Sequence, residues 1–211
     1  MSSRKILGVD FDDVLLDNNT SVARFHNERY GTSYVKEDNV DYFFEHLWGV
    51  STDEVIRRLD EWADSEYHKD APIIDGARDA LKKLKSRYDI VIISARPESS
   101  REVTEEWLQR HLPDFVSGIH FTGRVNHGSI TGTRKKSDVC NALGVSCFVE
   151  DALHWAEDIA AHAPHTEVLL FDSPWNRSEI PEGVTRVHSW EDIVSRLMKP
   201  DESDPRSLQA A

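Results

Sequence analysis

Three aspartates stand close together near the start of the sequence. Asp10, Asp12 and Asp13 lie at the end of the apolar run 5–10, which is typical of a buried strand. Carboxylates packed into the turn after such a strand repel one another and are costly to remove from water, and a bound cation offsets both costs. Because a tight turn can aim Asp10 and Asp12 at one point, the pattern favours a site for a hard metal such as Mg²⁺. The alternative is an acidic capped turn that binds nothing.

Groups suited to phosphate follow a second apolar run, at residues 89–94. This run ends in Ser94, Ala95 and Arg96. A hydroxyl donor beside a guanidinium at a strand end is a suitable pair of partners for a phosphate group. We therefore take Ser94, Ala95 and Arg96 as candidate phosphate-binding residues, with a surface ion pair as the alternative for Arg96.

Two further charged pairs stand at the ends of predicted elements. Lys135 and Lys136 precede the sequence SDVCNALG, which is typical of a short helix that stops at a glycine. A cation is unfavourable at a helix N-terminus, so an anionic partner is expected there unless the lysines are simply solvated. Glu150 and Asp151 end the apolar run 145–150. Their alternative role is to cap the helix that follows.

The elements that must position these residues alternate along the chain. Short, continuous apolar runs predict buried strands at 5–10, 89–94, 117–121, 145–150, 167–172 and 185–188. Amphipathic patterns between them predict helices at 75–87, 99–112, 136–143, 152–162 and 189–198. Strands that alternate with helices indicate an α/β fold, with a Rossmann-like parallel sheet between two layers of helices. The carboxyl ends of such strands meet at one edge of the sheet, where ligands bind.

One stretch of the chain interrupts this alternation. Between the first two predicted strands the sequence has only helical patterns, at 20–30, 37–48 and 51–68. We interpret this stretch as a small helical module inserted into the fold. The expected domains are a catalytic core at 1–17 and 70–198 and a helical insert at 18–69, followed by a polar tail at 199–211 that we expect to be disordered.

The composition excludes several classes of protein. The formal net charge of −13 argues against a nucleic acid polymer or an anionic membrane as the main partner. The two cysteines, Cys140 and Cys147, form no metal-ligand spacing and are expected to be reduced and structural. The first residues lack the pattern of a signal peptide, and no apolar run approaches the ~18 residues of a membrane helix, so we expect a cytoplasmic protein. The sequence leaves the oligomeric state open.

The four charged motifs occur in an order that resembles one known superfamily. The strings VDFDDVL, VIISARP, KKSDVCNALG and CFVEDA resemble, in that order, the motifs of the haloacid dehalogenase-like phosphohydrolases across about residues 5–175. The resemblance implies a phosphatase in which Asp10 is the nucleophile, forming an aspartyl phosphate. Asp12 would be the acid and base for the leaving alcohol and the attacking water. Members that cleave carbon–halogen bonds lack this second aspartate, so its presence favours phosphate esters.

The same resemblance implies a set of ligands. Mg²⁺ would be held by Asp10, the backbone carbonyl of Asp12, and Asp151, with Glu150 beside them. Ser94 would hold a phosphoryl oxygen. The charge of nucleophile and phosphate would be offset by a lysine of the KK pair, and Lys136 fits the family pattern better than Lys135.

The sequence departs from the family at several positions. Asp13 stands where the family often has Gly or Thr, and it either points away or binds the metal through water. The acidic pair is Glu-Asp rather than Asp-Asp, so Asp151 is the expected direct ligand. Arg96 is a subtype feature that is expected to touch substrate or phosphate. Asp158 is too far along its helix to match the family's downstream acid, and we expect it on the surface.

The substrate is expected to be a small phosphomonoester that meets the helical insert. In the family such an insert is a cap that closes over the site and excludes water. Phe43 and Trp48 are candidate substrate contacts, whereas Phe44 and Trp62 are expected in the core of the cap. The cap and the string LFDSPWN resemble the 5'(3')-deoxyribonucleotidase branch, which would make the protein a nucleotidase.

Other readings of the sequence stay open. Sugar phosphates are equally compatible substrates. The alternatives to a hydrolase are a non-catalytic or regulatory binding protein of the same fold and a phosphotransferase. A DxD turn also occurs in glycosyltransferases, but that class leaves the three later motifs unexplained.

Overall fold

The computed structural model describes residues 4–123, 125–126, 129–130 and 134–199. Most of the tail expected to be disordered, from residue 200 onward, lies outside this range. A parallel sheet of six strands forms the centre, in the order β3-β2-β1-β6-β7-β8. These strands are β1 (Lys5–Val9), β2 (Tyr88–Ser94), β3 (Gly118–Phe121), β6 (Val145–Glu150), β7 (Glu167–Phe171) and β8 (Val184–Val187). The α/β fold predicted from the apolar runs is therefore confirmed.

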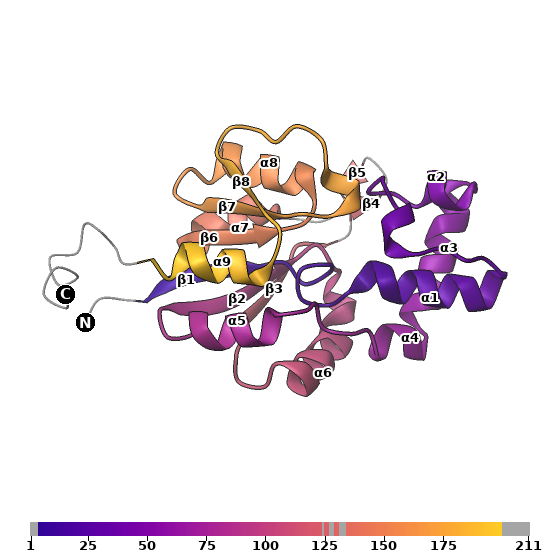
Figure 1. Ribbon diagram of the computed structural model, residues 1–211, viewed down its shortest axis with the longest axis horizontal. Coiled ribbons are helices and arrows are strands. Elements are labelled where there is room, and N and C mark those ends of the chain that lie inside the picture. Colours follow the sequence, from indigo (N-terminus) through magenta and orange to yellow (C-terminus); the bar gives the residue numbers. More distant parts are fainter. Residues whose placement is uncertain (1–3, 124, 127–128, 131–133, 200–211) are drawn as a thin grey trace, which may run out of the picture.

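Helices cover both faces of the sheet (Figure 1). Three of them pack on one face: α5 (Ala77–Leu84), α6 (Arg101–His111) and α9 (Trp190–Leu197). Two pack on the other: α7 (Lys136–Leu143) and α8 (Leu153–His162). Each of these helices falls within the range that its amphipathic pattern predicts. The shorter elements of this part are η2 (Glu98–Ser100), η3 (Pro174–Asn176) and the hairpin β4 (Val125–Asn126) and β5 (Ser129–Ile130).

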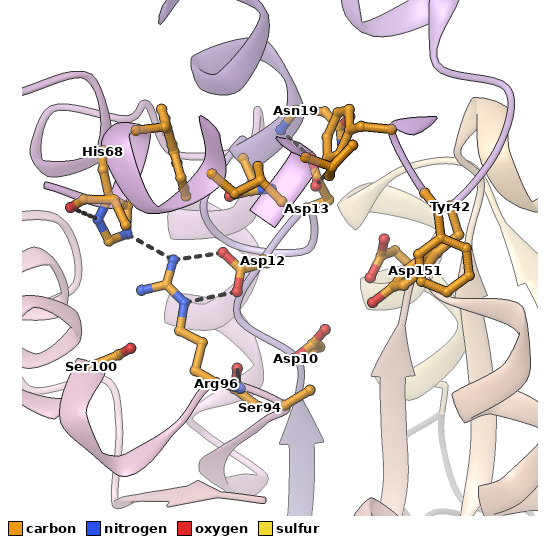
Figure 2. Close-up of a pocket in the computed structure, with 18 of the residues that line it drawn as sticks. Asp10, Asp12, Asp13, Asn19, Tyr42, His68, Ser94, Arg96, Ser100 and Asp151 are labelled. Carbon is orange, nitrogen blue, oxygen red and sulfur yellow. Dashed lines mark hydrogen bonds and ion pairs between the residues drawn. The ribbon is translucent and has the colours of Figure 1, made fainter. Parts of the chain in front are cut away.

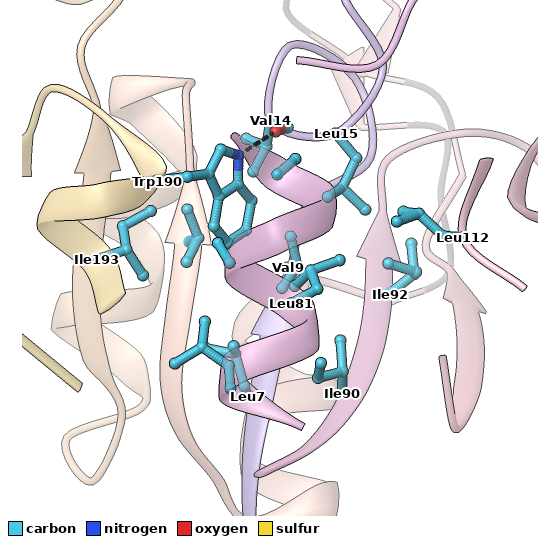
Figure 3. Close-up of a cluster of buried hydrophobic side chains, with 14 of the residues drawn as sticks. Leu7, Val9, Val14, Leu15, Leu81, Ile90, Ile92, Leu112, Trp190 and Ile193 are labelled. Atoms are coloured by element: carbon cyan, nitrogen blue, oxygen red, sulfur yellow. Dashed lines mark hydrogen bonds between the residues drawn. The ribbon is translucent and has the colours of Figure 1, made fainter. Parts of the chain in front are cut away.

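Alternate residues of each strand supply two separate hydrophobic cores. Leu7 and Val9 of β1 face α5 and α9 and are fully buried, as Figure 3 shows for the first core. Gly8 faces the second core, where a Cβ atom would lie 2.4 Å from Phe148 Cδ2. Because both faces are covered, strands read as continuous apolar runs rather than alternating ones. The same double burial fixes the register of β1 and so the position of the residues that follow it.

Four helices and a 3₁₀ turn lie beyond the carboxyl ends of the strands (Figure 1). They are α1 (Asn18–Tyr30), η1 (Lys36–Asp38), α2 (Glu45–Trp48), α3 (Thr52–Ala63) and α4 (Glu66–Lys69). We call residues 18–69 the cap. These helices share their own core, built from Val22, Phe25, Phe44, Trp48, Val55 and Trp62. Phe44 and Trp62 are thus in the cap core, as expected, while the division into two domains stays a prediction.

Two helices predicted in the cap are shorter than expected. The range 37–48 is helical only at η1 and α2, and the chain between them contains the exposed Val40 and half-exposed Tyr42 and Phe43. The range 51–68 is interrupted at Ser65, whose hydroxyl donates a 2.6 Å hydrogen bond to the Trp62 carbonyl. Such a bond between a hydroxyl and a nearby carbonyl competes with the helix and ends it. After the first break, Tyr42 packs against His154, outside the cap. After the second break, α4 begins as a separate helix.

Candidate active site

A cavity of about 280 Å³ lies between the carboxyl ends of the strands and the cap. Its size suits a small molecule. Its polar end is lined by Asp10, Asp12, Ser94, Arg96 and Asp151, all from loops at the strand ends. Its apolar end is lined by cap residues, among them Phe43, Phe44, Val55, Ile56, Leu59 and Trp62. The site therefore offers charge to one part of a ligand and apolar surface to another (Figure 2).

Lys136 connects the ends of two neighbouring strands. Its ammonium nitrogen lies 3.0 Å from Asp10 Oδ1, after β1, and 2.7 Å from Glu150 Oε2, at the end of β6. The Lys136 and Glu150 side chains are fully buried, and Asp10 is only 6% exposed. Lys135, by contrast, is partly exposed and pairs with Asp158 of α8 at 2.8 Å. The structure thus places Lys136 rather than Lys135 beside Asp10.

The acidic residues around this lysine have perturbed affinities for protons. Burial raises the pKa of Asp10 well above its ordinary value; Lys136 opposes the shift, whereas Glu150 and Asp12 add to it. Burial also raises the pKa of Asp151, and the charge of Glu150 adds to it. A cation would remove the cost of ionising both groups.

The residues present fit a metal ion. Ligand atoms of Asp10, Glu150 and Asp151 all lie within 4.8 Å of one another. Asp10 Oδ1 is buried, and its ion pair with Lys136 at 3.0 Å lacks the geometry of a hydrogen bond, so this oxygen keeps a lone pair for a cation. Carboxylate oxygens in such a cluster are the ligands that Mg²⁺ prefers. Both carboxylate oxygens of Glu150 already have partners in the protein, because they accept from Lys136 at 2.7 Å and from the Ala152 backbone N–H at 3.2 Å.

The turn η3 orients Asp151. Trp175 Nε1 donates a 2.9 Å hydrogen bond to Asp151 Oδ2, and Asn176 Nδ2 donates to the Asp151 carbonyl at 2.6 Å. Both donors belong to the string LFDSPWN, which resembles a nucleotidase branch but whose residues the sequence did not link to any function. Nothing in the sequence indicates that an indole reaches the acidic pair, since the contact spans 24 residues.

Arg96 forms an ion pair with Asp12. Its Nε and Nη2 atoms donate to the two Asp12 carboxylate oxygens at 2.8 and 2.7 Å, and Nη2 also lies 3.0 Å from His68 Nε2 of the cap (Figure 2). Burial would raise the pKa of Asp12, but the charge and hydrogen bonds of Arg96 outweigh it and lower that pKa. Arg96 was expected at the phosphate. In this structure the Nε and Nη2 atoms of Arg96 donate to Asp12 instead.

The remaining strand-end residues complete the polar end. Ser94 is 1% exposed, and its hydroxyl oxygen accepts from the Arg96 backbone N–H at 3.2 Å. Ala95 lies beside it on the cavity wall. Asp13 turns toward the cap: its carboxylate accepts from the Asn19 backbone and side chain at 3.0 and 2.8 Å. Of the two alternatives for Asp13, the structure shows the one in which it points away from the acidic cluster.

Two expectations for individual side chains are corrected, and one agrees with the structure. Trp48 lies inside the cap core, with its ring stacked 4.6 Å from Phe44 and 4.4 Å from His26, and it is not among the residues that line the cavity. Phe43 does line it. Asp158 is half-buried rather than on the surface, because it accepts from Lys135 and, at 2.6 Å, from Ser137 and so joins α7 to α8.

Two cap residues at the site were missed by the sequence reasoning. His68 of α4 is 5% exposed and reaches Arg96. Tyr42 packs edge-on against Phe43 and against His154 of α8, with ring centroids 5.1 and 4.8 Å apart. Desolvation of the phenol within the site, followed by the charges of Asp151 and its neighbours, raises the pKa of Tyr42, although part of the side chain is exposed. The predicted helix at 37–48 concealed the role of Tyr42 and Phe43, although Asn39 and Asp41, just before the pair, are residues common in turns.

The family model described as 5' nucleotidase, deoxy (pyrimidine), cytosolic type C protein matches residues 4–199. The chain belongs to this family. Relatives that resemble the chain include a protein of Halalkalibacterium halodurans provisionally named a nucleotidase, 26% identical over 192 residues that cover 89% of each chain. A nucleotidase of Clostridium acetobutylicum is 21% identical over 180 residues, which cover 84% of this chain and 87% of the relative. The chain is accordingly a hydrolase of small phosphomonoesters.

Solved structures agree on the fold. A haloacid dehalogenase-like hydrolase from Streptococcus pneumoniae superposes with a TM-score of 0.65 at 14% identity, over 93% of this chain and 99% of the other. A hydrolase of the same superfamily from Bacillus subtilis, described as bound to magnesium, superposes with a TM-score of 0.58 at 15% identity, over 93% and 99% of the two chains. The fold expected from the resemblance to the haloacid dehalogenase-like superfamily is confirmed. Among the described residues, no helix is long and apolar enough to cross a membrane.

Proposed function

We propose that this protein is a magnesium-dependent nucleotidase that hydrolyses a nucleoside monophosphate through an aspartyl phosphate on Asp10. The observation that carries the proposal is the buried arrangement of Asp10, Lys136 and Asp151 at three neighbouring element ends, with Asp12 two residues away. Membership of the nucleotidase family supports the substrate class. The bound magnesium in a protein of the same fold supports the choice of metal.

Asp10, Asp151 and the backbone carbonyl of Asp12 are the residues proposed to hold the ion, with Glu150 beside them. When bound, Mg²⁺ would neutralise charge on the phosphate and on the carboxylates around it. Glu150 already holds Lys136, so its proposed contribution is mainly to position that lysine. The Trp175 hydrogen bond to Asp151 is a partner of the kind that orients metal ligands.

Asp10 is the proposed nucleophile. A carboxylate oxygen of Asp10 attacks phosphorus, and the bond from phosphorus to the ester oxygen breaks. That oxygen takes a proton from the fraction of the protein in which Asp12 is protonated, a fraction that Arg96 reduces because it lowers the pKa of Asp12. In the second half, Asp12 takes a proton from water as the water oxygen attacks phosphorus. The bond between phosphorus and the Asp10 oxygen breaks, which releases inorganic phosphate and restores the Asp10 carboxylate. Lys136 offsets the negative charge of Asp10 and the phosphoryl group throughout. Ser94 and Ala95, on the cavity wall, are proposed to hold a phosphoryl oxygen.

The cap is proposed to bind the nucleoside. Phe43 and Tyr42 present aromatic rings at the cavity, and Val55, Ile56 and Leu59 provide an apolar wall. Bases are planar and stack on such surfaces. Trp48 is omitted from this proposal, because its ring is buried between other cap residues.

The test is release of inorganic phosphate from a panel of nucleoside monophosphates and sugar phosphates. Turnover with Mg²⁺, its loss with EDTA, and its loss in Asp10→Asn would support the proposal. Full activity in Asp10→Asn would disprove the role of Asp10, and preference for sugar phosphates would disprove the substrate class. A folded wild type that binds Mg²⁺ but turns over nothing would favour a binding protein. Transfer of phosphate to added alcohol instead of water would favour a phosphotransferase.

A further inference from the structure

Arg96 joins the core to the cap through two partners. It donates to both oxygens of Asp12 at 2.7 and 2.8 Å, and its Nη2 atom also meets His68 Nε2 at 3.0 Å. We propose that Arg96 is a positioning residue that orients Asp12 for proton transfer, and that His68 orients Arg96 only while the cap is docked. The inference rests on the proposed function and adds a link between cap position and the acid/base residue.

The surroundings of Arg96 hold its guanidinium in one place. Nη1 donates to Thr104 Oγ1 at 3.1 Å, and the guanidinium carbon lies 4.5 Å from the centre of the Phe11 ring. The side chain is 10% exposed. A planar guanidinium matches a carboxylate with two parallel hydrogen bonds, which fixes the orientation of the carboxylate as well as its position. A lysine at this position could supply charge but not that orientation.

The hydrogen-bond pattern of His68 determines which of its nitrogens accepts. His68 Nδ1 lies 3.0 Å from the Ala63 carbonyl oxygen, which can only accept, so Nδ1 carries the proton. Nε2 then presents a lone pair, which accepts from Arg96. The ring is held by Trp62, with centroids 4.4 Å apart. The contacts with Ala63 and Trp62 therefore hold the His68 ring in the cap, so that its Nε2 atom accepts from Arg96 of the core.

This arrangement distinguishes positioning from direct phosphate binding. If Arg96 held the phosphate, its loss would slow all esters alike. If it orients Asp12, its loss matters most when the leaving group needs a proton. The measurable quantity is kcat/KM for substituted phenyl phosphates of similar size whose leaving groups become more basic. That ratio reports phosphoryl transfer to the enzyme and is not affected by the later hydrolysis step.

In Arg96→Gln and His68→Phe we expect kcat/KM to fall more steeply than in wild type as the leaving group becomes more basic. For phenyl phosphate the loss should exceed that for 4-nitrophenyl phosphate by about tenfold in Arg96→Gln, because a positioned acid contributes about 10² to 10⁴. His68→Gln should restore most of the loss seen in His68→Phe, because the glutamine oxygen can accept from Arg96. In an Asp12→Asn background, Arg96→Gln should add no further leaving-group dependence.

The matched control is Arg110→Gln. Arg110 also joins the core to the residues at the end of α4, with hydrogen bonds to the Lys69 carbonyl and to Asp70 at 2.9 and 3.0 Å, but it does not contact Asp12. Its loss should leave the dependence unchanged. Equal losses for all esters in Arg96→Gln, or an equal effect of Arg110→Gln, would overturn the inference in an enzyme whose wild type is active.

A second readout does not require turnover. In ¹⁵N spectra of the full-length protein, the Arg96 Nε–H signal, identified by its absence in Arg96→Gln, should shift in Asp12→Asn and in His68→Phe but not in Arg110→Gln. A wild type without phosphatase activity would refute the proposed function, and this readout would still decide whether the cap contacts Asp12 through Arg96. An Arg96 signal that is insensitive to His68→Phe would overturn the inference.

Discussion

The ammonium of Lys136 lies 2.7 Å from the carboxylate of Glu150, and both side chains are fully buried. Burial lowers the pKa of the lysine, but the charges of Asp10 and Glu150 outweigh it, and the pKa is raised above its ordinary value. Lys136 therefore stays charged, and each partner depends on the other, because an isolated buried charge is costly.

Lys136→Met should abolish phosphatase activity and destabilise the fold by about 3 to 5 kcal/mol, since it leaves Asp10 and Glu150 buried without a cation. The measurements are phosphate release and urea unfolding at neutral pH. Lys135→Met is the control in the same helix turn. Its side chain is 43% exposed, so its loss should cost less than about 1 kcal/mol. Equal effects of the two substitutions would contradict the assignment of Lys136.

Trp175→Phe should weaken the metal site while leaving the fold intact. The substitution keeps the ring and removes the hydrogen bond to Asp151. Loss of such a partner typically costs about 10- to 100-fold in metal affinity or activity. The measurement is the Mg²⁺ concentration for half-maximal activity.

The control for this prediction is Trp155→Phe. Trp155 is buried, and its Nε1 atom has no hydrogen-bond partner among the described residues, whereas the partly buried Trp175 donates to Asp151. Its removal should leave the Mg²⁺ requirement unchanged. A Trp175 variant with the wild-type Mg²⁺ requirement would show that Asp151 needs no orientation by the indole.

Acid should destabilise the cap through His26. Burial, with the nearby charge of Arg58, lowers the pKa of His26 from 6.5 to about 4. Its Nε2 atom lies 2.9 Å from Arg58 Nη1, and its Nδ1 atom lies 2.8 Å from Thr32 Oγ1. The folded state therefore requires the neutral ring, because a proton on Nε2 would face the arginine.

The sign of the pH effect follows from that pKa. Between pH 6.5 and about 4 the unfolded chain binds the proton and the folded chain does not. Stability from this group is complete above pH 6.5, is lost as the pH falls, and is fully lost below about 4. Urea unfolding should show a steeper decline from pH 7 to 4.5 in wild type than in His26→Gln. His165→Gln, an exposed control, should decline like wild type, and identical slopes for all three proteins would contradict this account.

Gly8→Ala should destabilise the core without changing the catalytic residues. The new Cβ would lie 2.4 Å from Phe148 Cδ2 and 3.1 Å from Val145 Cγ1, so the second core must shift. Overpacking of this kind typically costs about 1 to 3 kcal/mol. Thermal unfolding measures the loss, and Phe148→Leu in the same chain should recover part of it. Gly118→Ala is the control, because its nearest contact is an ordinary 3.6 Å. A stable Gly8→Ala protein would show that β1 tolerates displacement.

Much of the fold and part of the site could be read from the residues alone. Strands buried on both faces must be apolar throughout, so the runs ending at Val9, Ser94 and Glu150 were recognisable, and a parallel sheet brings their ends together. The four charged motifs and their order were likewise local features. These features sufficed to predict the α/β fold and to nominate Asp10 and Asp12, because each is tied to the end of a strand that its own sequence predicts. The choice of Lys136 over Lys135, and of Asp151 as the direct ligand, came from the resemblance to the haloacid dehalogenase-like family.

The partners of those residues were decided only by the tertiary structure. His68 reaches Arg96 across 28 positions, and Arg96 reaches Asp12 across 84. Hydrogen bonds of this kind leave no periodicity in the sequence. The loop around Tyr42 was predicted as part of a helix, but the Tyr42 ring packs against Phe43 and against His154, outside the cap core. Trp48 has a similar pattern and packs into that core instead. Whether an aromatic ring of the cap packs inside the cap core or outside it is decided by how the cap packs on the sheet. Burial of the ring is favourable in either place, and the local sequence does not specify which surface will cover it.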